Sequence, residues 1–196
     1  MSNRLNIIDF DETLYKHDSL IRFCLFIYKK RPLQIINVFK QVLAFLLYSF
    51  KLINTKVYKE MFLSFANGIN ENQFYDLSVE FWNKEFPSNF NQQIINTIEN
   101  SNRTICISAS PELYLRYICE KLKIELIGTK LEYKDSKYYI VGENCKGQEK
   151  LNRLNHYMQN QEFVIDSSYS DSLTDMPIFK ISNNAFLVKG NTLTKL

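Results

Sequence analysis

The 196-residue chain is poor in histidine, glycine and proline, and its few cysteines are scattered. It has 2 His and 4 Cys, and no two cysteines form a CxxC pair. Zinc sites are built from clustered Cys and His, so we expect no zinc site and free thiols in a reducing compartment. With 5 Gly and 4 Pro, the composition also excludes a collagen-like or a low-complexity disordered chain.

The chain also has a small net charge and no recognisable secretion signal. The formal net charge of +3 is too small to indicate a nucleic-acid partner. Acidic residues at positions 9, 11 and 12 interrupt the place where the apolar part of a secretion signal would lie. We therefore expect a cytoplasmic protein that binds no nucleic acid and either stays in solution or sits peripherally at the inner membrane face.

The chain does have 45% hydrophobic residues, and their pattern changes along its length. An apolar strand near residues 5–10 precedes a long, mostly helical stretch, and from residue 104 short β-type segments alternate with helices. Such alternation is typical of a parallel α/β sheet. We predict an α/β core formed by residues 1–16 and 98–196. An all-helical cap, residues 17–97, is inserted after the first strand and lies above the carboxyl ends of the strands.

Two carboxylates stand at the end of the first predicted strand. Asp9 and Asp11 flank Phe10, and because side chains alternate along a strand, both carboxylates point to the same side. Two acids this close repel each other unless a cation lies between them or one keeps its proton. One can then attack as a nucleophile while the other carries protons, so both are candidate catalytic residues.

A second segment, residues 108–112, follows the predicted strand 104–108. Ser110 has the residue type of a helix N-cap, and Pro111 suits the first helical position. The Ser108 hydroxyl and nearby backbone N–H groups would then converge on an anion at the helix N-terminus.

Two further segments carry a lysine and a pair of acids. Lys146 directly precedes a predicted helix, where it can neutralise a phosphate or a carboxylate. Asp171 and Asp175 follow a hydrophobic strand, and acids at this point suit Mg²⁺. Taken singly, each has an ordinary explanation as a surface lysine or a loop acid. Together with a carboxylate nucleophile and a hydroxyl, they are the groups that phosphoryl transfer needs.

The four segments, in this order, resemble the motifs of the haloacid dehalogenase superfamily, specifically its phosphoserine phosphatase-like branch. The resemblance extends over essentially the whole chain. It implies a Rossmann-like core with a helical cap, and hydrolysis of a phosphomonoester through an aspartyl-phosphate with Mg²⁺ as cofactor. It also implies that Asp9 is the nucleophile and that Asp11 is the general acid–base, whose backbone carbonyl binds Mg²⁺.

The same resemblance implies roles for the other motif residues. Ser108 and the N–H of Ala109 would bind the phosphate, and Lys146 would pair with the nucleophile and the phosphate. Asp171 would bind Mg²⁺ directly, with Asp175 as its supporting partner, so that the expected metal site involves four acids. Further contacts with the phosphate or the substrate are expected from Thr13, Asp18 and Thr174.

Three positions depart from the phosphoserine phosphatase pattern. Glu12 stands where glycine is common, so its side chain must point away from the phosphate. Asp18 replaces a glutamate that holds the substrate amine, and Thr174 replaces an asparagine that contacts the phosphate. These differences weaken the assignment of phosphoserine as the substrate and leave the hydrolytic groups unchanged.

A closer resemblance is to small bacterial hydrolases of the same branch, the phosphatidylglycerophosphatase C-type group. It is carried by residues 108–115, 144–150 and 169–177. It implies a lipid phosphate such as phosphatidylglycerophosphate as substrate. The alternatives are a soluble small-metabolite phosphatase and a phosphotransferase that forms the same aspartyl-phosphate. A non-catalytic membrane-binding module would leave the four motifs unexplained.

The most apolar stretch, residues 33–53, falls within the predicted cap. Gln34, Asn37 and Gln41 form a narrow polar stripe on it at helical spacing. The stretch is long enough to span a bilayer, but Lys40 lies near its middle, where charge is costly. Two alternatives are left open at equal weight: a helix lying in a membrane interface, and a helix buried in the core of the cap.

The surroundings of this stretch are basic. Residues 17–60 contain eight Lys or Arg and two acids, Asp18 and Glu60, a formal excess of six positive charges. A basic, apolar cap is what an anionic membrane surface attracts. We therefore expect peripheral contact of the cap with an anionic membrane, and a phosphorylated small molecule or lipid as the substrate.

Overall fold

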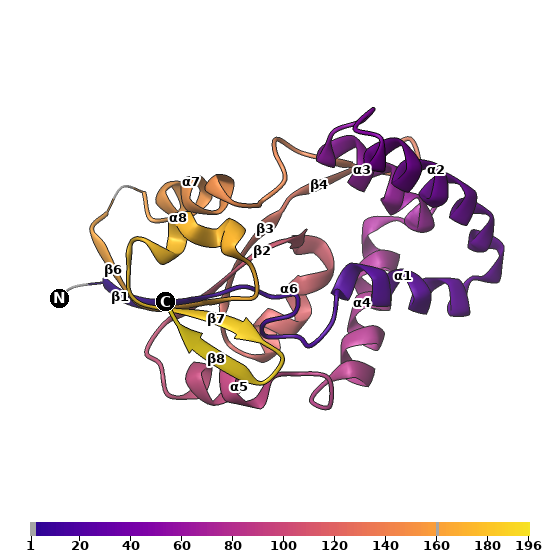
Figure 1. Cartoon of the computed structure of the whole chain (residues 1–196). Helices are drawn as coiled ribbons and strands as arrows, with labels where there is room; N and C mark the ends of the chain where they lie inside the picture. The colour runs from indigo at the N-terminus through magenta and orange to yellow at the C-terminus, as the bar shows by residue number, and fades with distance from the viewer. Residues whose placement is uncertain (1–2, 160) are drawn as a thin grey trace.

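The structure is a computed structural model that describes residues 3–159 and 161–196. Within these residues the main sheet has the strand order β3-β2-β1-β6-β7-β8, and β4 and β5 form a separate hairpin (Figure 1). The sheet strands are β1 (Asn3–Ile8), β2 (Thr104–Pro111), β3 (Glu125–Thr129), β6 (Phe163–Ser170), β7 (Ser182–Lys189) and β8 (Thr192–Lys195). Neighbouring strands are parallel except β7 and β8. The predicted α/β fold with a mostly parallel sheet is confirmed.

β1 lies in the middle of the sheet because it is apolar on both faces. Leu5 and Ile7 are buried in one hydrophobic cluster and Ile8 in a second. Side chains of α7 and α8 join the first cluster, and side chains of α5 and α6 join the second. These helices are α5 (Gln92–Glu99), α6 (Glu112–Lys121), α7 (Gln148–Tyr157) and α8 (Met176–Phe179). The carboxyl end of β1, where Asp9 follows Ile8, therefore lies between the ends of β2 and β6.

A helical insertion, residues 19–85, lies between β1 and β2 in the chain and at one end of the sheet in space (Figure 1). Its helices are α1 (Ser19–Lys30), α2 (Val38–Ser49), α3 (Thr55–Phe62) and α4 (Glu71–Glu85), with the 3-10 segments η1 (Pro32–Asn37) and η2 (Leu63–Ala66). Pro32, Gly68 and Pro87 all lie outside the α-helices, because proline and glycine disfavour a helix interior.

The insertion packs on the core through α4 and α6. The indole N–H of Trp82 on α4 donates a hydrogen bond to the carbonyl of Tyr114 on α6, and the two rings stack. The hairpin of β4 (Leu131–Lys134) and β5 (Lys137–Ile140) also contacts the insertion. There the Tyr138 hydroxyl donates to the carbonyl of Ile69 at 2.9 Å. A hairpin from the second half of the chain thus supports the insertion.

Three segments refine the predicted outline. β6 extends to Ser170, because its ladder with β1 continues as far as Tyr169 and depends on the backbone and not on the side chains. β8 was not predicted, since it is a short, polar edge strand without an apolar alternation. The cap boundaries at residues 17 and 97 stay a prediction, but α5, which lies mostly inside them, buries its isoleucines in the same cluster as Ile8.

Candidate active site

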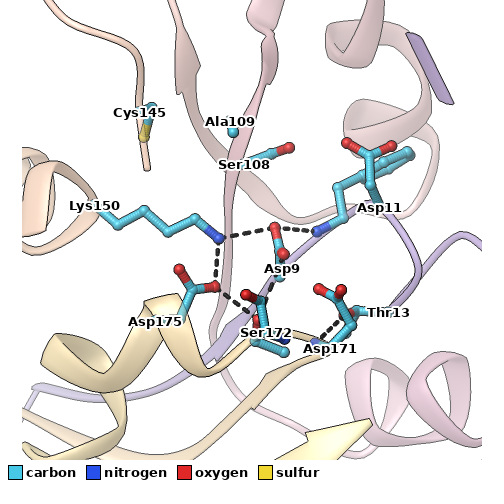
Figure 2. Close-up of polar contacts among 12 residues, drawn as sticks. Asp9, Asp11, Thr13, Ser108, Ala109, Cys145, Lys150, Asp171, Ser172 and Asp175 are labelled. Atoms are coloured by element: carbon cyan, nitrogen blue, oxygen red, sulfur yellow. Dashed lines mark hydrogen bonds and ion pairs between the residues drawn. The ribbon is translucent and has the colours of Figure 1, made fainter. Parts of the chain in front are cut away.

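The four predicted segments meet at the carboxyl ends of β1, β2 and β6 and the start of α7 (Figure 2). A pocket of about 370 Å³ opens there. The core lines it with acids and lysines, α2 lines it with Tyr48, and α3 lines it with Thr55, Tyr58 and Lys59. The pocket therefore lies between the core and the helical insertion, and both contribute side chains to it.

Asp9 is held at the strand end by backbone and by charge. Its N–H donates to the carbonyl of Tyr169 on β6 at 2.9 Å, and its Oδ1 lies 2.9 Å from the Nζ of Lys150. The same Nζ lies 2.6 Å from Oδ2 of Asp175 (Figure 2). Burial raises the pKa of Asp9, against the attraction of Lys150. Burial alone would lower the pKa of Lys150, but its two acids outweigh burial and raise it. Lys150 is therefore a permanent cation between two carboxylates.

The predicted pairing of Lys146 with Asp9 is wrong, because Lys150 makes this contact. Lys146 is exposed in the loop before α7, where it lines the pocket. Lys150 lies in the first turn of α7 and is 3% exposed. A signal was present in the sequence: Lys150, Leu154 and Met158 recur at spacings of four and form the buried side of α7. A lysine on the apolar side of a helix needs buried acids as partners.

The carboxylate of Asp11 is held by two donors. Its Oδ1 accepts the N–H of Ser19, the first residue of α1, at 2.8 Å, and its Oδ2 accepts the Ser110 hydroxyl at 2.6 Å. Burial raises the pKa of Asp11 to about 6, with repulsion from Asp18 as a second cause. A carboxyl that titrates near neutral pH can both give and take a proton, as a general acid–base must.

The end of β2 differs in detail from the prediction. Ser110 is not the N-cap of α6: β2 continues through Pro111, which is the N-cap, and the Ser110 hydroxyl is donated to Asp11 instead. Ser108 is fully buried, and its hydroxyl accepts the N–H of Ser110 at 3.0 Å. Ala109 lines the pocket. Both Ser108 and Ala109 lie beside Asp9 (Figure 2), and their contact with a phosphate stays a prediction.

Thr13 joins the first and the fourth segments. It is 1% exposed, and its hydroxyl accepts the N–H of Asp171 at 2.9 Å. This bond gives Thr13 a positioning role, and its predicted contact with the phosphate stays a prediction. Asp18 caps α1 by accepting the N–H of Ile21 at 2.9 Å and also lines the pocket.

Two other predicted positions lie at the pocket wall. Thr174 is exposed there, and its hydroxyl is 2.9 Å from that of Ser172. Glu12 has a φ of 55°, in the left-handed region that favours glycine, and its side chain is exposed. This backbone conformation is the physical reason for a glycine preference at this position.

Of the four acids predicted for the metal site, Asp9 and Asp171 face each other, and the metal roles of all four stay a prediction. Asp171 lies against Asp9, and burial together with repulsion from Asp9 raises the pKa of Asp171 to about 6. The carboxylate of Asp11 is bound to Ser19 and Ser110, and that of Asp175 to Lys150 and to Ser170. Across residues 3–159 and 161–196, no group of three or more His, Cys, Asp or Glu side chains converges as a metal site. Two facing carboxylates still suit Mg²⁺, which prefers oxygen ligands and keeps several waters.

The sequence pattern of the haloacid dehalogenase-like hydrolases matches residues 7–180. The chain belongs to this family. The matched range includes Asp9, Asp11, Lys150 and Asp171 and thus all four segments of the pocket. The predicted membership of the haloacid dehalogenase superfamily is confirmed. None of the curated proteins matches the chain.

Several solved structures have a similar fold. A protein of unknown function from Bordetella pertussis Tohama I has a TM-score of 0.78 at 18% identity, covering 94% of this chain and 89% of that one. A phosphoserine phosphohydrolase-like protein from Francisella tularensis subsp. tularensis SCHU S4 has 0.58 at 18% identity, covering 94% and 86%. A phospho-aspartyl intermediate analogue of phosphoserine phosphatase has 0.61 at 15% identity, covering 94% and 86%. At such identities the likeness shows the fold. The finer phosphatidylglycerophosphatase C-type assignment stays a prediction.

Proposed function

We propose that this hydrolase is a Mg²⁺-dependent phosphomonoesterase in which Asp9 attacks phosphorus. The observation that carries the proposal is the arrangement around Asp9. One of its oxygens is paired with the buried Lys150, while Asp171 faces its carboxylate and Asp11 can hold a proton near neutral pH. The similar folds of a phosphoserine phosphohydrolase-like protein and of a phosphoserine phosphatase support it.

The residues of the pocket divide the reaction between them. Lys150 holds Oδ1 of Asp9, which leaves Oδ2 to form the bond to phosphorus as the bond to the leaving oxygen breaks. Asp11 donates its proton to that leaving alkoxide and then takes a proton from the water that hydrolyses the aspartyl-phosphate. Mg²⁺, held by Asp9, Asp171 and the Asp11 carbonyl, would neutralise the charge of the phosphate.

The insertion supplies a cation to the substrate side of the pocket. Lys59 of α3 donates from Nζ to the carbonyl of Ala109 and to Oδ1 of Asn144, both at 2.8 Å. Burial lowers the pKa of Lys59 to about 8, so it is still largely protonated at neutral pH. A lysine beside the phosphate site favours a substrate with a second anionic group, as in a phosphorylated metabolite or a lipid phosphate. Of these, we favour the lipid phosphate, because of the surface described below.

The experiment is a comparison of two Asp→Asn variants on p-nitrophenyl phosphate with Mg²⁺. Asp9→Asn removes the nucleophile, and we expect turnover to be abolished while the melting temperature shows a folded chain. Asp166→Asn is the matched control, because Asp166 also lies on a core strand but pairs with Arg4 at 2.7 Å outside the pocket. We expect the control to keep its activity. Full activity of the Asp9 variant would refute the mechanism.

The same assay, run over a panel, separates the substrate classes. Phosphatidylglycerophosphate in detergent micelles stands for lipid phosphates, and phosphoserine and other phosphorylated metabolites stand for soluble ones. Added alcohol acceptors reveal a phosphotransferase by the new phosphoester that it would form. We expect the highest kcat/KM for the lipid phosphate. A preference for phosphoserine would favour the soluble alternative.

A further inference from the structure

The helical insertion carries a large exposed apolar surface. Its members lie on η1, on α2 and in the turn that follows: Leu33, Ile36, Phe39, Phe45, Phe50 and Leu52, called here the apolar face. Leu33 is 92% exposed, Phe39 79% and Phe50 73%. Soluble proteins seldom expose large side chains in one continuous patch unless the patch binds something. One of the two open alternatives, in which this stretch forms the core of the cap, is therefore wrong.

The polar stripe of the same stretch faces inward. The side-chain amide of Gln34 donates to the carbonyl of Asn67 at 2.9 Å, and that of Gln41 donates to the carbonyl of Phe62 at 2.8 Å. Ala44, on the same side of α2, is fully buried. The usual arrangement of a surface helix, with polar residues outward, is thus reversed. The helix is fixed to the insertion by hydrogen bonds while its apolar side is left outside.

The charges around the apolar face indicate what covers it. Residues 19–59 contain eight Lys or Arg and no Asp or Glu. Lys40 and Lys51 are exposed on α2 and in the turn after it, next to Phe39 and Phe50. A second copy of the chain would bring these like charges together, whereas an anionic lipid surface offers both negative headgroups and an apolar interior. We propose that the apolar face docks on an anionic lipid bilayer.

The docked helix lies in the interface and does not span the bilayer. Pro32–Ser49 is the one stretch of the described chain long and apolar enough to cross a membrane, and 6% of it is buried in the protein. Crossing would break the bonds of Gln34 and Gln41 to the insertion and would carry Lys40 into the hydrocarbon, which is costly. Lying in the interface keeps these bonds and leaves Lys40 at the headgroups.

The apolar face is continuous with the pocket, a consequence that rests on the proposed function. Tyr48 at the end of α2 and Thr55 at the start of α3 line the pocket, and the exposed Phe50 and Leu52 lie in the turn between them. A bilayer seated on this turn places phosphorylated headgroups next to the pocket. The substrate would then be a lipid phosphate taken from the membrane surface.

The test is flotation of the full chain with vesicles, which requires no catalysis. Vesicles of equal parts phosphatidylglycerol and phosphatidylcholine are compared with phosphatidylcholine alone at low salt. We expect flotation with the anionic vesicles only, weakening as salt is added. Phe39→Ser with Phe50→Ser should abolish it without changing the melting temperature or the turnover of p-nitrophenyl phosphate. The matched control, Ile181→Ser with Leu196→Ser, alters two exposed apolar residues of the core.

The contribution of charge is tested separately. Lys40→Gln with Lys51→Gln should weaken binding to the anionic vesicles by roughly 25-fold, since each cation near such a surface contributes about fivefold. Lys123→Gln with Lys180→Gln is the control: these lysines are also exposed, and Lys123, like Lys51, has a positive φ. We expect no loss in the control.

Three results would overturn the proposal. They are absence of flotation at low salt, flotation that the variants of the apolar face leave unchanged, and flotation equal on both vesicle types. A dimer that sedimentation detects, that Phe39→Ser with Phe50→Ser dissociates, and that binds no vesicles would assign the face to self-association. None of these readouts depends on turnover, so a failure of the proposed phosphatase function is distinguished from a failure of docking.

Discussion

Replacing Lys150 by Met tests the assignment of the central cation. The side chain is 3% exposed and forms ion pairs of 2.9 Å with Asp9 and 2.6 Å with Asp175. Lys150→Met keeps the length of the side chain but leaves two buried carboxylates without their cation. At an effective dielectric constant of about 20, each pair attracts by roughly 6 kcal/mol. Part of this attraction is offset, because the variant no longer desolvates a lysine and because Asp9, whose pKa burial raises, can take up a proton. Removing one partner of a buried ion pair costs about 3–5 kcal/mol.

We therefore expect Lys150→Met to lower the free energy of unfolding by about 3 kcal/mol at pH 7.5. For a chain of this size that corresponds to a fall in melting temperature of about 6–12 °C. The loss should shrink as the pH falls, because burial raises the pKa of Asp9 and a protonated Asp9 no longer needs the cation. Turnover of p-nitrophenyl phosphate should fall by about 10²–10³, as expected when one group that stabilises the charged transition state is removed.

Lys146→Met is the matched control, since Lys146 is exposed and lies four positions earlier in the chain. Its effect on the free energy of unfolding should stay within about 0.5 kcal/mol. Melting temperatures from scanning calorimetry and initial rates, measured on the two variants, show which lysine is the cation of the site. Equal stability and activity of the two variants would contradict the reasoning, as would a larger loss of activity at Lys146.

Two further predictions concern pH. Burial raises the pKa of Asp11 and of Asp171 to about 6, so the stability they contribute is fully present below about 4 and is lost as pH rises through 6. In calorimetry with EDTA, the melting temperature of the wild type should fall between pH 5 and 7.5, and it should fall more steeply than that of Asp171→Asn. Adding Mg²⁺ should raise the melting temperature of the wild type more at pH 7.5 than at pH 5. An equal slope in the two proteins would count against this prediction. Lys59, with its pKa lowered to about 8, loses its charge above that pH. KM for an anionic substrate should then rise in the wild type and stay flat in Lys59→Gln, and parallel pH profiles would exclude a role for Lys59.

The position of Asp11, the proposed general acid–base, depends on the insertion. Asp11 accepts the N–H of Ser19, the residue with which α1 begins. The N-terminus of a helix favours a nearby negative charge, so α1 holds the ionised form of Asp11 in place. The packing of the insertion on the core therefore also determines the orientation of the Asp11 carboxylate.

Much of the site follows from local rules that a sequence displays. The apolar run that ends at Ile8 predicts a buried strand, and it predicts Asp9 at the strand's carboxyl end. The pairing of parallel strands then brings the segments after β1, β2 and β6 to one edge, as the structure shows. Residues that directly follow a strand, such as Asp171, therefore lie at the pocket, as predicted.

Details that depend on side-chain direction could not be predicted in the same way. Whether Ser110 caps α6 or donates to Asp11 depends on how far β2 continues, and the pairing of Pro111 with Thr129 on β3 decides that. Lys146 and Lys150 differ by about one helical turn, and although the spacing of Lys150 from Leu154 indicates a buried side, the packing of α7 on the sheet decides which acids the lysine meets there.

The sequence by itself determined the type of fold, the family and the set of acids, because strand periodicity and residue order are properties of the chain. Only the tertiary structure decided which groups touch: Lys150 with Asp9, and Ser110 with Asp11. It also decided which side of α2 is outside. A stretch with both polar and apolar sides can face either way, and its direction is set by the hydrogen-bonding partners that the neighbouring helices offer to Gln34 and Gln41.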